Sequence, residues 1–189
     1  MSATTHPSSG DLDRLIELLR ERSVTRGDFV LASSRRSSYY IDARRTTMSG
    51  AGQLLIGSLG LSALQAHGWS PRAVGGLTLG ADPVAYAIAH AAYRSGLALD
   101  VFSVRKATKT HGTVQRIEGC LTAGDAVVVV EDVITTGRSA LEAITAVREA
   151  GARVLGVLAV VDRGEGGGAH IEAAGVPVAT LVAVDQLGV

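Results

Sequence analysis

Two adjacent carboxylates, Glu131 and Asp132, follow four consecutive valines and precede a short turn of Thr, Gly and Ser residues at 135–139. The valine run predicts a strand that is buried on both faces, as in a parallel sheet, and that ends at the carboxylates. Paired carboxylates can accept hydrogen bonds from the two hydroxyls of a ribose, and a small-residue turn that opens a helix exposes N–H groups to an anion. The segment therefore predicts a ribose-phosphate site. The alternative is an ordinary strand–turn–helix whose acids only cap the helix.

A run of eight residues rich in cations, at 105–112, directly follows another predicted strand. Its functional members are Arg105, Lys106, Lys109 and His111. Charge runs are usually solvated surface. Because this run directly follows a strand, ends at a glycine and has no helix or strand periodicity, a mobile lid is the competing interpretation. Such a lid could neutralise a leaving pyrophosphate and exclude water from an activated sugar.

Two further strand ends carry candidate contacts. The glycine-rich turn at 75–85 joins a strand to a helix, with Asp82 as the expected N-cap, and its N–H groups at 78–81 could bind a pyrophosphate. Asp162 and Arg163 end another strand. They are either a surface ion pair of little energetic weight, or they present a guanidinium that can bind a planar carboxylate through two hydrogen bonds.

Alternating strands and helices must position these residues. The pattern predicts a first helix capped by Asp11, two strands within 24–41 joined by a polar turn at 33–38, and a helix over 49–67. The rest alternates, which favours an α/β fold with a doubly wound parallel sheet of about five strands. Its strands are expected at 72–78, 97–104, 126–130, 153–161 and 178–183, and its helices at 82–94 and 138–150. Ligands of such sheets bind at the carboxyl ends of the strands, where all four motifs fall.

Length and composition restrict the class of protein. The 189 residues suit one domain, expected over 11–189 after a disordered tail at 1–10. Eighteen basic and eighteen acidic residues cancel, so no bulk charge favours nucleic acid or an anionic membrane. A single cysteine, a polar start and the absence of a long apolar run predict a cytoplasmic protein without disulfides, signal peptide or membrane span.

The motifs resemble those of a known family. Residues 127–139 are similar to the signature of the type I phosphoribosyltransferases, a hydrophobic strand, two acids, two apolar residues and T-[TA]-G-x-[ST]. The cationic run at 105–112 is similar to the catalytic loop of the orotate phosphoribosyltransferases, with all four functional positions present. Residues 29–42 resemble the N-terminal hood of that family, F-x-L-x-S-G-x-x-S-x-Y-[FY]-x-[DN].

The resemblance implies an activity, a fold and partners. The activity is transfer of the phosphoribosyl group from 5-phosphoribosyl 1-pyrophosphate (PRPP) to N1 of orotate, giving orotidine 5′-monophosphate and pyrophosphate in pyrimidine (UMP) synthesis. The fold is a core over about 46–189 with a small hood over about 11–45. Mg²⁺ is expected to bind through substrate oxygens, without a dedicated protein ligand. A homodimer is implied in which the 105–112 loop, with Lys106, Lys109 and His111, acts on the neighbouring subunit.

The resemblance also implies roles for individual residues. The expected contacts to the ribose and 5′-phosphate are Glu131, Asp132, Val133, Ile134, Thr135, Thr136, Gly137, Arg138 and Ser139. The pyrophosphate is expected at Thr78, Leu79, Gly80, Arg105, Lys106, Lys109 and His111, with a further basic position at Arg44. Orotate is expected at Tyr40, Ile41, Thr135 and Arg163. The catalytic group comprises Asp132 and the four loop residues Arg105, Lys106, Lys109 and His111.

Two departures and two alternatives accompany this interpretation. Leu79 and Ala32 stand where many relatives carry lysine, and Ser34 where they carry glycine. One alternative is a transferase of the same fold that acts on another base, and the Asp162–Arg163 pair counts against it. The other is a regulator that binds PRPP without turning it over, and the retained loop cations count against that.

Overall fold

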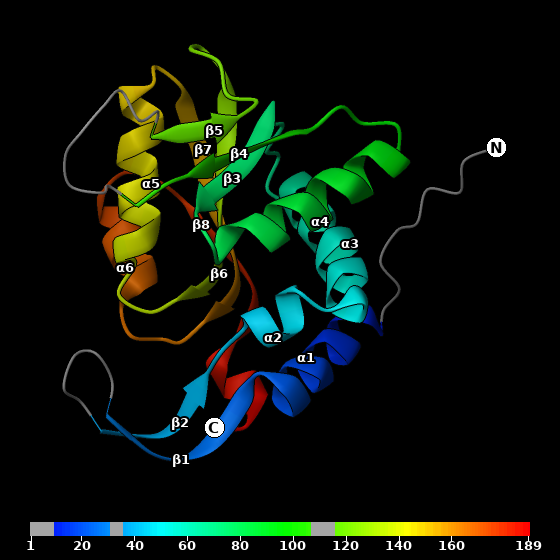
Figure 1. Ribbon diagram of the computed structural model, residues 1–189, viewed down its shortest axis with the longest axis vertical. Helices are drawn as coiled ribbons and strands as arrows, with labels where there is room; N and C mark the ends of the chain where they lie inside the picture. Colours follow the sequence, from blue (N-terminus) through cyan, green and yellow to red (C-terminus); the bar gives the residue numbers. More distant parts are fainter. Residues whose placement is uncertain (1–9, 31–35, 107–115) are drawn as a thin grey trace.

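The computed structural model describes residues 10–30, 36–106 and 116–189, and its centre is a six-stranded sheet (Figure 1). The strand order is β5-β4-β3-β6-β7-β8, and every neighbouring pair is parallel except β4 and β5. The strands are β3 (Ala73–Leu77), β4 (Asp100–Val104), β5 (Ile117–Gly119), β6 (Ala126–Ile134), β7 (Arg153–Asp162) and β8 (Val178–Ala183). The predicted α/β class and parallel sheet are confirmed, with six strands in place of about five.

Helices cover both faces of the sheet. On one face lie α3 (Gly50–Ala66) and α4 (Ala81–Arg94), and on the other lie α5 (Arg138–Glu149) and α6 (Gly167–Ala173) (Figure 1). Successive side chains of a strand point to opposite faces, so the valines of β6 are divided between two cores. Val128 and Val130 pack in the core that includes α3 and α4, and Val127 and Val129 in the core that includes α5. The valine run is thus explained by burial on both faces.

The strand β6 is longer than the sequence indicated. It was predicted to stop before the two acids, but it continues through them to Ile134. The neighbouring β3 pairs with β6 only as far as Val129, whereas β7 stays paired with β6 to the end, matching Ile134 with Asp162. At the two acids, β6 is therefore paired with β7 on one side and has no strand partner on the side of β3.

Several short elements have no counterpart in the sequence prediction. These are α2 (Arg44–Thr47), β5, α6 and the 3-10 helix η1 (Val184–Leu187). Each is too short for a periodic pattern, and α6 begins in a run of glycines. The predicted N-caps were also displaced, because α1 (Asp11–Arg22) and α4 are capped at Gly10 and Gly80.

The N-terminal hairpin stands apart from the central sheet. Its strands β1 (Val24–Val30) and β2 (Arg36–Ile41) are antiparallel and form a sheet of their own. The end of the chain packs against this region, since the Arg20 guanidinium donates to the Gln186 carbonyl at 2.5 Å and that of Arg26 to the Gly188 carbonyl at 2.7 Å. The division into a hood over 11–45 and a core over 46–189 stays a prediction. Within the described ranges, no helix is long and apolar enough to cross a membrane.

Candidate active site

An open pocket of about 530 Å³ lies at the carboxyl ends of β3, β6 and β7, beside the end of β2. Its lining includes thirteen of the sequence-predicted residues: Tyr40, Ile41, Arg44, Thr78, Leu79, Gly80, Lys106, Glu131, Asp132, Val133, Thr135, Ser139 and Arg163. The remaining lining residues are Asp42, Ala43 and Leu77. Motifs that are up to 123 positions apart in the sequence therefore meet in one place, as the position of each at a strand end predicted.

Burial raises the pKa of both acids. The Glu131 side chain is almost enclosed, with 5% of the residue exposed, and its Oε1 has no hydrogen-bond partner within the described part of the chain. Burial, followed by the neighbouring Asp132, raises the pKa of Glu131 to about 8, although Lys106 favours the charged form. Burial also raises the pKa of Asp132. The N–H of Val133, which donates to Asp132 Oδ1 at 2.9 Å, has the opposite effect and lowers this pKa. Glu131 is therefore mainly protonated at neutral pH when no ligand is bound.

The small-residue turn forms a hollow next to this pocket. Its volume is about 40 Å³, and its lining includes Ile134, Thr136, Gly137 and Arg138. Gly137 has φ +79° as the N-cap of α5, and a Cβ there would come within 2.7 Å of the Gly167 carbonyl, so only glycine fits. The N-terminus of a helix above such a turn is suited to an anion. Ile134 itself is buried in the core, so only its backbone can contribute.

Part of the turn after β3 is already engaged by the protein. The N–H of Thr78 donates to the Val104 carbonyl at 2.8 Å, so this N–H already has a partner and the pyrophosphate contact of Thr78 stays a prediction. The Thr78 hydroxyl donates to Asp82 Oδ2 at 2.6 Å, and the Ser103 hydroxyl donates to the other oxygen of Asp82. Asp82 thus ties the turn to β4 instead of capping α4. Leu79 is 57% exposed.

Arg163 is held at the end of β7. Its residue exposure is 8%, and its backbone N–H donates to the Ile134 carbonyl at 3.0 Å. The guanidinium forms an ion pair with Glu165 at 2.9 Å and lies over the Tyr39 ring, 5.3 Å from its centroid. Its Nε is buried without a partner among the residues described, so the guanidinium retains hydrogen-bonding capacity.

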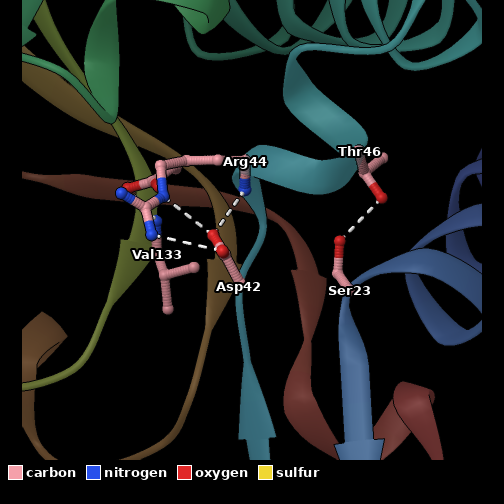
Figure 2. A network of polar contacts seen from close by, with 6 residues as sticks. Ser23, Asp42, Arg44, Thr46 and Val133 are labelled. Carbon is pink, nitrogen blue, oxygen red and sulfur yellow. Dashed lines mark hydrogen bonds and ion pairs between the residues drawn. The ribbon is translucent and has the colours of Figure 1, made fainter.

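An ion pair at the pocket rim joins Arg44, whose basic position was predicted, to Asp42, which was not singled out from the sequence. Figure 2 shows Asp42, which directly follows β2, facing the guanidinium of Arg44, which extends towards Val133 on β6. The pair is bidentate, with Arg44 Nε 2.8 Å from Asp42 Oδ1 and Nη2 3.2 Å from Oδ2. This contact lowers the pKa of Asp42 and raises that of Arg44. Only the i, i+2 spacing of opposite charges could have indicated it. A hydrogen bond of 2.7 Å between the Ser23 and Thr46 hydroxyls, drawn dashed in Figure 2, joins the start of β1 to α2.

The cationic run is only partly described. Lys106 lines the pocket of its own chain. Arg105 is not among the described lining residues, and its guanidinium pairs with Glu118 on β5 at 3.2 Å. Lys109 and His111 lie outside the described residues, as do Ala32 and Ser34 of the hairpin turn.

Comparison with known proteins decides the family. Residues 54–179, two thirds of the chain, match the phosphoribosyl transferase domain. The chain belongs to the phosphoribosyltransferase family. Within that family it is 48% identical to the orotate phosphoribosyltransferase of Mycobacterium avium over 178 residues, which cover 94% of this chain and 97% of the relative. It is 44% identical to the enzyme of the same name from Aquifex aeolicus, with 93% and 96% covered.

Solved structures agree with this assignment. The crystal structure of Mycobacterium tuberculosis orotate phosphoribosyltransferase in complex with PRPP is similar to this chain with a TM-score of 0.81 and 42% identity. The match covers 95% of this chain and 99% of that one. The resemblance to the orotate phosphoribosyltransferases that the motifs indicated is thereby confirmed, and the type I phosphoribosyltransferase fold with it.

Proposed function

We propose that this phosphoribosyltransferase transfers the phosphoribosyl group of PRPP to N1 of orotate, in the cytoplasm, as a step of pyrimidine synthesis. One observation carries the proposal: a buried arginine suited to a planar carboxylate, Arg163, lines the same pocket as the acid pair and the small-residue turn. Orotate differs from uracil by such a carboxylate. The relatives at 44–48% identity carry the name of this activity.

In this proposal the protein mainly positions the substrates and stabilises charge. Glu131 and Asp132 accept hydrogen bonds from the ribose hydroxyls, and the turn at 135–139 binds the 5′-phosphate. The bond from the anomeric carbon to pyrophosphate breaks while N1 of orotate bonds to that carbon from the opposite face, and the proton of N1 is released to the departing pyrophosphate or to water. Positioning and fixed charges can together contribute many kcal/mol to such a step, so no protein nucleophile is required.

The pyrophosphate is expected at the turn after β3. Leu79 and Gly80 line the pocket there, and Arg44 and Lys106 supply positive charge on the same lining. Thr78 contributes through the shape of the turn, because its N–H and hydroxyl already have partners. Arg44 thus offers a cation in a chain that has leucine where many relatives have lysine.

The donor set of the pocket fits a Mg²⁺ ion that arrives with the substrate. Glu131 and Asp132 offer carboxylate oxygens, and Mg²⁺ usually binds through one or two carboxylates together with substrate phosphates and waters. Throughout the described ranges, no group of three or more His, Cys, Asp or Glu residues is placed to hold an ion. When bound, the ion would neutralise charge on the departing pyrophosphate.

The reaction is tested by ultraviolet absorbance. Purified protein with PRPP and Mg²⁺ is expected to consume orotate and to regenerate it when pyrophosphate is added to the product. Uracil and hypoxanthine, assayed in parallel, are expected to remain. Consumption of one of these bases instead would indicate a transferase for another base. Tight PRPP binding without turnover of any base would indicate a regulator.

The proposed assembly is a homodimer in which loop residues act on the neighbouring subunit. Large apolar side chains stand exposed on α3 and α4, at Leu54, Tyr86 and Tyr93, and such side chains are enriched at interfaces. Because Lys106 lines the pocket of its own chain, we propose the exchange for the loop residues beyond it, including Lys109 and His111.

Mixing two inactive variants tests this exchange. Lys109→Ala subunits lack a loop cation, and Asp132→Asn subunits lack a pocket carboxylate. Random mixing should restore about one quarter of wild-type activity, because about half of the dimers would hold one intact site of two. Each variant alone is the control. Mixed dimers, verified by differential tagging, that stay inactive would argue against action in trans.

Gly80, in the turn after β3, lies so close to the Asp132 carboxylate that we expect no larger residue to be tolerated there. Gly80 has helical φ of −65°, which alanine also adopts, but a Cβ there would lie 2.5 Å from Asp132 Oδ1. Gly80→Ala should therefore displace the Asp132 carboxylate and raise the PRPP KM about 10–100-fold, an effect of misplaced catalytic groups. The matched control is Gly50→Ala in the first turn of α3, where a Cβ meets no atom within 4 Å. Equal kinetics of the two variants would contradict the prediction.

A further inference from the structure

Two residues hold the guanidinium of Arg163 from outside the pocket. Arg163 belongs to the pocket lining, whereas Glu165 and Tyr39 are absent from the lining as far as the chain is described. Glu165 contacts one edge of the guanidinium, and Tyr39 contacts one face. Their contacts therefore act on the orientation of Arg163 and leave its pocket side to a ligand.

The turn after β7 brings Glu165 back beside Arg163. Gly164 has φ +66°, and its N–H donates to Asp162 Oδ1 at 2.9 Å, so the chain reverses within two residues. The resulting ion pair joins Arg163 Nη2 and Glu165 Oε1 at 2.9 Å, with side chains only 7% and 19% exposed. An ion pair so little exposed is screened less than a surface pair and fixes its geometry more firmly.

The hairpin supplies the second constraint. Tyr39 lies on β2, and its ring centroid is 5.3 Å from the Arg163 Cζ, within the range of a cation–π contact. The Ser37 hydroxyl donates to the Tyr39 carbonyl at 2.7 Å, which fixes the local backbone. With its own N–H bound to the Ile134 carbonyl, Arg163 is constrained at its backbone, one edge and one face.

We propose that Glu165 is a positioning residue that orients Arg163 and so sets the selectivity for a pyrimidine that bears a carboxylate. An unconstrained arginine loses considerable side-chain entropy when it is immobilised by a ligand, and a pre-oriented one loses less. Glu165 does not line the pocket, and Nε of Arg163 has no hydrogen-bond partner in the described part of the chain. The proposal rests on the proposed function, because it assigns the carboxylate of the ligand to Arg163.

The test compares two nucleotides that differ by one carboxylate. Binding of orotidine 5′-monophosphate and uridine 5′-monophosphate is measured by titration calorimetry. Glu165→Ala should weaken the first about 10–100-fold, as loss of a supporting contact commonly does, and change the second less than about twofold. Glu165→Gln keeps the acceptor Oε1 and should restore most of the lost affinity.

Two controls separate positioning from damage to the fold. Glu172→Ala removes an exposed carboxylate on α6 and should leave both affinities unchanged. Combining Glu165→Ala with Arg163→Ala should weaken orotidine 5′-monophosphate no further than Arg163→Ala alone, since Glu165 acts through Arg163. Equal weakening of both nucleotides by Glu165→Ala, or no weakening of either, would overturn the proposal. A wild-type protein that leaves orotate unconverted and binds both nucleotides equally would instead overturn the proposed function.

Discussion

Replacing Arg163 by alanine should lower kcat/KM for orotate about 10²–10³-fold, because truncating one partner of a buried charge pair costs about 2–5 kcal/mol. Arg163 is 8% exposed and lines the pocket between the hairpin and β7, so water cannot readily replace its hydrogen bonds to a bound carboxylate. The measurement is steady-state kinetics in each substrate with the other saturating. The KM for PRPP should change less than about threefold, since the acid pair and the turn at 135–139 remain.

Arg163→Lys is the informative control. Lysine keeps the charge but lacks the planar fork and its stacking on Tyr39, so it should recover only a small part of the loss. Full recovery would mean that charge alone is needed. Equal losses for orotate and PRPP in the alanine variant would place Arg163 outside the base site.

Replacing Glu131 by glutamine should stabilise the ligand-free protein increasingly as the pH rises. The pKa of Glu131 is raised from 4.5 to about 8, mainly by burial and then by Asp132. Below pH 4.5 the folded and unfolded states both bind the proton, so this group contributes no penalty. Between pH 4.5 and 8 the unfolded state ionises while the folded state stays protonated, so the wild type progressively loses stability and the glutamine variant does not.

The expected gain at pH 9 is at most about 5 kcal/mol, or on the order of 10 °C in Tm, with almost none at pH 4.5. It is measured as the difference in Tm between variant and wild type across this range, without substrates. Glu172→Gln, at an exposed position on α6, is the matched control for replacing a carboxylate by an amide. A Tm difference for Glu131→Gln that stays constant from pH 4.5 to 9 would contradict a raised pKa of Glu131.

The main part of the site was accessible from the sequence because the chemistry coincides with strand ends. The four-valine run, the acids and the small-residue turn are consecutive, and parallel strands bring their carboxyl ends to one edge of a sheet. Thirteen of the predicted residues consequently line one pocket. The short elements were missed, because α2, α6 and β5 span too few residues to show a period.

Local pattern could not show which polar groups were already engaged. The Thr78 N–H looked free for pyrophosphate, but the parallel pairing of β3 with β4 carries it to the Val104 carbonyl. Likewise, the end of β6 was misplaced, because its length depends on how far β7 accompanies it beyond β3. Both outcomes depend on strand register, which only the assembled sheet defines.

The sequence by itself determined the fold class, the family resemblance and the identity of the acids, the turn and Arg163, since these follow from residue type and spacing along the chain. Tertiary structure alone decided the environment of those groups. It buried Glu131 so that its pKa rises, and it placed Tyr39 against Arg163 although 124 positions separate them in the chain. The physical reason is that desolvation and cation–π contacts depend on distances in space. A sequence pattern predicts such distances only between residues of one regular helix or strand, and not between elements that the fold brings together.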